Sequence, residues 1–362
     1  MKIVKHRREQ LPNPKFQTST KAQIGRCSAV VALFLMAGLG VRPASACDMC
    51  SVYASMTAQG VGGKGFFAGV VEQYIHEGTL QNSGQEVANT TGQYLNDSVT
   101  TIYGGYHLNS RLDLQFNIPV IYRCYERPVG NTIQTASESG VGDVSLVGNF
   151  ALLQKVDKDF SFTWNLLAGV KFPTGDSSRL NDPEYLSGGG SHSFHAALAS
   201  SSPGATTSAV QATNSGVWSH QLALGSGSLD GVVGTSISTR WQHILFNAGM
   251  QYSLTTEGDY SHQYANDLTW NGGPGNYFLM KDDYTLALQA ICSGDDRGDD
   301  TYSGVADGHS ALTIVYLGPQ ISFTWTDKLS ALLAVDLPVS TDNSGLQTVP
   351  DYKVRASLRW NF

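Results

Sequence analysis

The chain has 362 residues, of which 15% are charged and 10% aromatic, and it contains 39 glycines. That length suits one large β domain or two ordinary domains. No run approaches the ~20 apolar residues that a membrane-spanning helix needs, and the net charge of −7 argues against a nucleic-acid partner.

Residues 1–46 have the features of a secretory signal peptide. A basic region that includes Arg7 and Arg26 precedes the apolar run 28–41, and Ala44-Ser45-Ala46 follows. This order predicts cleavage after Ala46 and export across the inner membrane; a buried helix of a cytoplasmic protein is the alternative. The first 46 residues hold 8 Lys/Arg and 1 Glu, so the mature chain keeps 23 − 8 = 15 basic and 30 − 1 = 29 acidic residues, a net charge of −14.

The mature chain would begin with the sequence "CDMC", in which Cys47 and Cys50 frame two residues. Such a pair can close a small disulfide, cycle as a redox pair or bind a soft metal, and lipidation of Cys47 is a further interpretation. No His follows for haem attachment and no second pair completes a zinc site. We expect residues 47–63 to form a periplasmic segment.

From residue 64 onward the chain alternates apolar and polar residues, as "RLDLQFNIPV" and the C-terminal "DYKVRASLRWNF" show. Successive side chains on a strand point to opposite faces, so each run predicts a strand with one apolar and one polar face. Each run is near or above the ~9–11 residues of a tilted membrane-spanning strand. About twelve runs follow one another: 64–76, 93–108, 111–123, 141–154, 159–173, 222–241, 243–255, 266–280, 283–293, 309–325, 329–339 and 351–362.

Short and long connections alternate along these strands, with long polar ones at 124–140, 173–219 and 340–350 among others. Outer-membrane barrels sort their short periplasmic turns and long extracellular loops in this way. In hydrocarbon every backbone polar group must be paired, which a closed sheet achieves. We therefore predict an all-β protein, a transmembrane antiparallel up-and-down β-barrel of about 12 strands over residues 64–362, with a long extracellular insert at 174–219. A secreted soluble β protein is the alternative.

This interpretation places the protein in the outer membrane of a Gram-negative-type (diderm) bacterium, in contact with outer-membrane lipid and lipopolysaccharide. The terminal aromatic residues Trp360 and Phe362 are expected to be the signal that the barrel-assembly machinery recognises.

The polar faces carry charges that we expect to line the lumen. They either select solutes electrostatically, as charged rings do in pores, or brace the interior as ion pairs, since a twelve-strand barrel lies between filled barrels and wide porins. The candidates are Asp113, Asp143, Lys171, Asp230, Arg240, Asp336, Lys353, Arg355 and Arg359.

Two polar loops are candidates for a divalent cation: His192 and His195 in a Ser/Gly-rich stretch, and the acidic "GDDRGDD" at 294–300. Solvated loop charge is the simpler interpretation of both. Acidic extracellular loops could also bridge lipopolysaccharide through calcium or magnesium.

Three stretches carry a family resemblance: "SGVGDVSLVGNFAL" at 139–152, "LLAGVKFPTGD" at 166–176 and "LGSGSLDGVVGTSIS" at 224–238. Their order and spacing resemble the meta-pathway phenol-degradation family of outer-membrane barrels, whose members are often labelled "transporter". The resemblance implies a channel-like barrel that admits small aromatic or other hydrophobic molecules.

The expected function is transport of small solutes through a lumen that is continuous or closed only by residues 174–219 or 47–63. One alternative is a structural or adhesive barrel with a plugged lumen. The other is an outer-membrane hydrolase, which is less expected because "HLNS" at 107–110 lacks a following Asn-Gly and Ser110 lies in a predicted periplasmic turn. We therefore predict that the protein is not an enzyme.

Overall fold

The computed structural model describes residues 65–129, 131–182 and 215–362, all within one structural unit, Pro43–Phe362. The predictions for the signal peptide, Cys47, Cys50, His192 and His195 lie outside these residues. In the described part of the chain, no helix combines the length and apolar character needed to cross a bilayer.

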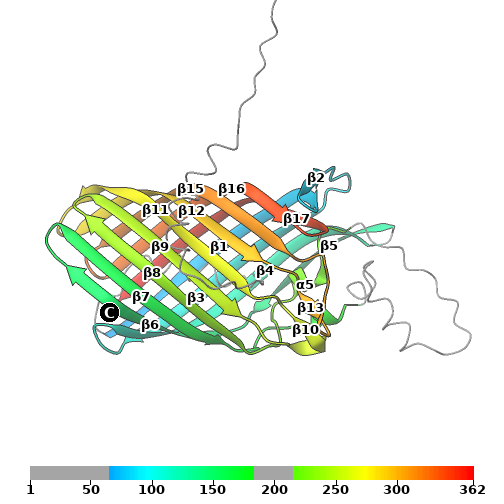
Figure 1. The fold of residues 1–362 in the computed structure, drawn as a ribbon, viewed down its shortest axis with the longest axis horizontal. Helices are drawn as coiled ribbons and strands as arrows, with labels where there is room; N and C mark the ends of the chain where they lie inside the picture. Colours follow the sequence, from blue (N-terminus) through cyan, green and yellow to red (C-terminus); the bar gives the residue numbers. More distant parts are fainter. Residues whose placement is uncertain (1–64, 130, 183–214) are drawn as a thin grey trace, which may run out of the picture. The chain divides into compact units, whose positions relative to one another are not determined.

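Within the described residues, twelve long antiparallel strands form a closed barrel (Figure 1). The last strand pairs with the first, so that Phe67 lies opposite Asn361 and the wall has no open edge. The prediction of a closed barrel of about twelve strands is confirmed. The strands are β1 (Gly65–Asn82), β3 (Tyr94–His107), β4 (Leu112–Val129), β6 (Ser145–Val156), β7 (Phe160–Lys171), β8 (Asp230–Trp241), β9 (Ile244–Leu254), β11 (Asp267–Met280), β12 (Tyr284–Arg297), β15 (Leu312–Trp325), β16 (Leu329–Asn343) and β17 (Leu346–Asn361).

The two faces of the wall are inverted relative to a water-soluble protein. On β4, Leu114 and Phe116 are exposed on the outside, whereas Asp113, Gln115 and Asn117 are buried in the interior. The other strands repeat this alternation, with apolar side chains such as Leu333 facing outward. An apolar band around a closed sheet is solvated by acyl chains rather than by water, so the barrel spans the outer membrane.

The connections between strands differ in length at the two ends of the barrel. Short turns follow β3, β6, β8, β11 and β15, and the long connections gather at the opposite end, which is the extracellular end in outer-membrane barrels. Small elements decorate that end: β2 (Gln85–Val87), β5 (Thr132–Val141), η1 (Ser178–Asn181), α5 (Ser219–Leu222), η2 (Asp259–Ser261), β10 (His262–Gln263), β13 (Thr301–Tyr302) and β14 (Val305–Ala306).

Two connections predicted as loops are largely strand. β4 runs on to Val129 and pairs with β5, and β16 and β17 meet at a tight turn in which Gly345 has φ of 62°. The apolar band ends before these extensions do. Above the membrane water solvates both faces, so the strands continue there without the apolar alternation that marks a membrane span.

The strand predicted over 222–241 begins only at Asp230. The preceding residues leave the wall and fold into the barrel mouth, because their apolar side chains find apolar partners there.

Candidate functional site

Residues 215–229, here called the plug segment, lie in the extracellular mouth of the barrel. Val217 and Leu222 are fully buried against Leu95 and Tyr125, which point inward from β3 and β4. Leu224 packs in a second cluster with two further inward residues, Val99 and Ile121. Full burial of a Val or Leu side chain contributes about 1.5–3 kcal/mol, so these contacts hold the segment in the mouth.

Hydrogen bonds tie the first half of the plug segment to the wall. The Thr348 N–H donates to the Gly216 carbonyl (2.8 Å) from β17. The Trp218 indole N–H donates to the Leu346 carbonyl (2.8 Å), and its ring stacks on His309 with centroids 5.7 Å apart. The segment is thereby fixed to the closing strand and to the loop that precedes β15.

Two arginines reach the plug segment from β4. The Arg123 guanidinium donates to the Ala223 carbonyl and pairs with Asp97 at 3.1 Å. Arg127 donates to the Ser219 hydroxyl (3.1 Å). Both arginines are buried, so their charges are satisfied by the plug segment as well as by the wall.

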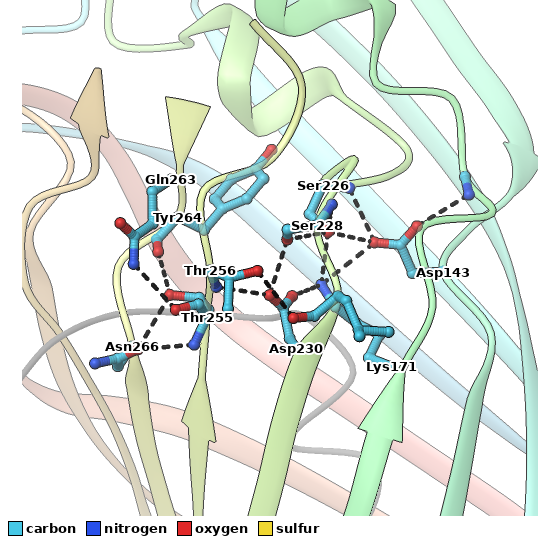
Figure 2. Close-up of polar contacts among 12 residues, drawn as sticks. Asp143, Lys171, Ser226, Ser228, Asp230, Thr255, Thr256, Gln263, Tyr264 and Asn266 are labelled. Carbon is cyan, nitrogen blue, oxygen red and sulfur yellow. Dashed lines mark hydrogen bonds and ion pairs between the residues drawn. The ribbon is translucent and has the colours of Figure 1, made fainter. Parts of the chain in front are cut away.

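A buried ion network around Lys171 anchors the second half of the plug segment (Figure 2). The Lys171 Nζ lies 2.6 Å from Asp230 Oδ2 and 3.3 Å from Asp143 Oδ2, and it donates to the Ser226 hydroxyl at 3.0 Å. Asp143 Oδ2 also accepts the Ser226 N–H (2.9 Å) and hydroxyl (2.7 Å). Two carboxylates and one ammonium leave one negative charge, which these donors stabilise.

The same two carboxylates organise the neighbouring loops. Asp143 Oδ1 accepts the N–H groups of Thr174 (3.1 Å) and Gly175 (2.9 Å), and Asp230 Oδ1 accepts the Ser228 hydroxyl (2.8 Å). The stretches 139–152, 166–176 and 224–238, which are far apart in the sequence, therefore meet at one point of the mouth.

Close backbone packing explains two glycines in these stretches. A Cβ on Gly225 would lie 2.5 Å from the Gly175 carbonyl oxygen, and a Cβ on Gly175 would meet Gly225 in turn. The Gly225 N–H donates to the Asp176 carbonyl at 3.0 Å. Only residues without a side chain allow the plug segment to approach the loop after β7 this closely.

Eight of the nine predicted lumen charges are buried inside the barrel. Arg355 pairs with Asp336 at 2.8 Å, and Lys353 lies 3.4 Å from Asp295 and 3.9 Å above the Tyr316 ring. The remaining predicted charge, Arg240, sits at the periplasmic rim. Whether any of these charges selects solutes stays a prediction.

Two of the eight buried charges, Arg359 and Asp113, lie in the periplasmic half of the barrel. Arg359 is 3.4 Å from His107 Nε2 and 4.2 Å above the Phe67 ring, and His107 Nδ1 is 3.9 Å from Asp113. These side chains are buried inside the barrel at the end opposite the plug segment.

The candidates named from the sequence are all charged, and neutral amides line the interior beside them. Gln289 Oε1 accepts hydrogen bonds from Gln320 (3.0 Å) and Asn247 (3.4 Å), and Gln115 donates to Asn117 (2.6 Å). These amides lie on the same face of their strands as the predicted charges. The alternation that places Asp113 inside the barrel therefore also predicts inward positions for them.

A cavity of about 100 Å³ lies between the plug segment and the wall. This is smaller than the ~300–1,000 Å³ of sites for drug-sized ligands. Its walls are both apolar and charged, and they include Leu95, Asp97, Ile121, Arg123, Lys171 and Leu224.

Two titratable groups of the mouth have shifted pKa values. Burial lowers the pKa of His220, although the charges of Asp300 and Asp307 act in the opposite direction. Burial acts to raise the pKa of Asp300, but the hydrogen bond from His262 and the charges of His220 and His262 outweigh it and lower the pKa.

These features define the class of protein: an outer-membrane β-barrel in which the plug segment packs inside the extracellular mouth. An outer membrane channel from Pseudomonas putida F1 shares its fold, with a TM-score of 0.54 and 13% identity over 83% of this chain and 96% of that chain. At that identity the likeness shows the fold alone. No protein-family model matches the chain, and no curated protein matches its sequence.

Two autotransporter domains align less well. The β domain of the Bordetella autotransporter BrkA has a TM-score of 0.40 and 8% identity over 82% of this chain and 99% of that chain. The translocator domain of NalP from Neisseria meningitidis has a TM-score of 0.38 and 11% identity over 93% and 98%. At these scores neither carries an argument about this chain, and the phenol-degradation resemblance stays a prediction.

Proposed function

We propose that the protein is an outer-membrane channel for small solutes whose extracellular mouth is closed by the plug segment in the conformation described. One observation carries this proposal: the plug segment is not part of the wall. The β7–β8 pairing, with Lys171 opposite Asp230, closes the wall below it. Displacement of the segment would therefore open the mouth while leaving the cylinder intact.

The solute class follows from the cavity beneath the plug segment. Its apolar side, with Leu95, Ile121 and Leu224, suits an aromatic or aliphatic group, and Arg123 and Asp97 suit a polar substituent. We propose small hydrophobic or aromatic molecules that carry a polar group, which agrees with the implication of the phenol-degradation resemblance.

The paired charges of the lumen would give the open channel weak charge selectivity, because most cations inside lie beside a carboxylate. Trp360 and Phe362, exposed at the periplasmic end of the closing strand, would serve the barrel-assembly machinery. The acidic extracellular loops would contact lipopolysaccharide.

Conductance across a planar bilayer tests the proposal. The refolded chain is compared with a variant in which residues 216–224 are replaced by a Gly-Ser linker of equal length. We expect brief, rare openings from the parent and steady conductance from the variant. A matched control replaces 83–91, around β2, which lies outside the plug segment, and should behave like the parent.

A structural barrel without transport is the second candidate, favoured by the ion pairs and hydrogen-bonded amides that line the interior. It predicts that both the parent and the 216–224 variant remain silent while folded. That result would overturn the channel proposal.

A further inference from the structure

A second polar cluster, separate from the Lys171 network, joins the plug segment to two extracellular loops. We call it the mouth histidine cluster: His220, His262, Asp300 and Asp307. His220 belongs to α5, His262 to β10, and the two aspartates flank β13 and β14. Figure 1 shows α5, β10 and β13 at the same end of the barrel.

Donor atoms of His220, Asp300 and Asp307 converge, and His262 lies beside the shared carboxylate of Asp300. His262 Nε2 lies 3.5 Å from Asp300 Oδ2, and His220 Nε2 lies 4.0 Å from the same oxygen. One donor atom each from His220, Asp300 and Asp307 lies within 4.8 Å of the others. Donors bound at ~2.0–2.2 Å to a tetrahedral metal are about 3.3–3.6 Å apart, so small side-chain rotations bring the set to coordination distance.

We propose that the mouth histidine cluster binds one divalent transition-metal ion of the zinc class and that this ion latches the plug segment to the loops after β9 and β12. Two imidazole nitrogens with carboxylate oxygens are a donor set that zinc and its neighbours prefer. Calcium and magnesium take oxygen ligands almost exclusively, so they are disfavoured at this site.

The surroundings hold the donors in place, as outer contacts do at metal centres. Asp300 Oδ1 accepts the Ala265 N–H (3.0 Å), which turns Oδ2 toward the histidines. Asp307 Oδ1 accepts the Ser310 hydroxyl (2.7 Å), and the Ser310 Oγ in turn accepts the Asp300 N–H (2.7 Å). The backbone carbonyl of His220 accepts the Tyr264 hydroxyl at 2.7 Å.

Burial separates this cluster from ordinary loop charge. His220, His262 and Asp300 are 6%, 1% and 2% exposed, and they come from three separate loops. Such a site forms only when the plug segment occupies the mouth, so metal binding and mouth closure are linked. The latch role rests on the proposed channel function, whereas metal binding does not.

Titration with Co²⁺, followed by its visible absorption, tests the site in detergent-solubilised full chain. Cys47→Ser and Cys50→Ser are introduced first, so that the N-terminal thiols cannot bind the metal. We expect one equivalent of Co²⁺ with the intense bands of a four-coordinate ion, displaced by Zn²⁺. His220→Gln and Asp307→Asn should each weaken binding at least tenfold, whereas the control His243→Gln, in a periplasmic turn, should not.

Absence of Co²⁺ binding, or binding that is equally tight in His220→Gln and Asp307→Asn, would overturn the site and leave the cluster as a set of hydrogen bonds and ion pairs. Folding of each variant is checked by heat-modifiable gel mobility. Asp307 is only half-buried, so its variant decides the question if His220→Gln does not fold. Because binding is measured without conductance, a silent channel would not affect this result.

Discussion

Arg355 on β17 and Asp336 on β16 form a two-pronged ion pair inside the barrel, with Nε 2.8 Å from Oδ2 and a terminal nitrogen 3.2 Å from Oδ1. Both side chains are almost completely buried. Two parallel hydrogen bonds of this kind fix the geometry of both groups. The pair therefore braces the strand that closes the cylinder.

Asp336→Asn should lower the free energy of unfolding by about 3–5 kcal/mol, because it removes the carboxylate that neutralises the buried Arg355. Urea unfolding of the refolded barrel measures the change. Asp327→Asn, in an exposed periplasmic turn, is the matched control and should have little effect. Asp336→Leu combined with Arg355→Met should recover most of the lost free energy of unfolding. A double variant less stable than Asp336→Asn would contradict this explanation.

Lys171→Met should raise the open probability of the channel severalfold. The change leaves Asp143 and Asp230 as two buried carboxylates without their shared ammonium, and it removes the donor to Ser226 in the plug segment. Single-channel recording gives the open probability directly. Lys328→Met removes an exposed lysine in a periplasmic turn and should have the open probability of the parent. If Lys171→Met and Lys328→Met had the same open probability, the Lys171 network would not hold the mouth closed.

Gly225→Ala should open the mouth without changing any charge. The new methyl group would sit 2.5 Å from the Gly175 carbonyl oxygen, so the plug segment has to move away from the loop after β7. We expect increased conductance and faster protease cleavage within 215–229. Gly104→Ala, where the nearest atom to the new Cβ is 3.8 Å away, controls for the substitution, and unchanged cleavage of Gly225→Ala would contradict the prediction.

The wall was predictable from the sequence because lipid on one side and a polar lumen on the other impose a period of two. The same parity located Lys171, Asp336 and Arg355 inside the barrel. The alternation does not predict which residues these side chains contact. Lys171 contacts Asp230 because of the register between β7 and β8, and it contacts Asp143 because of the path of the loops, and the alternation specifies neither.

The sequence predicts the plug segment only in part: residues 215–219 belong to the predicted insert 174–219, one of the two segments expected to close the lumen, whereas residues 222–229 are predicted as strand. Its sequence "GVWSHQLAL" has no period that distinguishes it from the start of β8. The available signal lay in its partners: Leu95, Val99, Ile121 and Tyr125 occupy inward parity positions near the extracellular ends of β3 and β4. Apolar residues at positions that should be polar indicate that something apolar fills the mouth.

The outer face of β16 provides the test of the membrane assignment itself. Leu333 points outward and is 50% exposed, near the middle of the part of the strand that crosses the bilayer. Leu333→Arg should cost about 2–4 kcal/mol of stability in lipid vesicles, because a cation at the bilayer midplane loses its hydration.

Ile244→Arg is the matched control, because Ile244 is also exposed on the outer face but lies at the periplasmic end of β9. A cation near the interface costs only about 0–1 kcal/mol. Urea unfolding from vesicles of one lipid composition gives both values. A protein solvated by water on its outer face would tolerate the two arginines equally, so equal costs would contradict a lipid-facing β16.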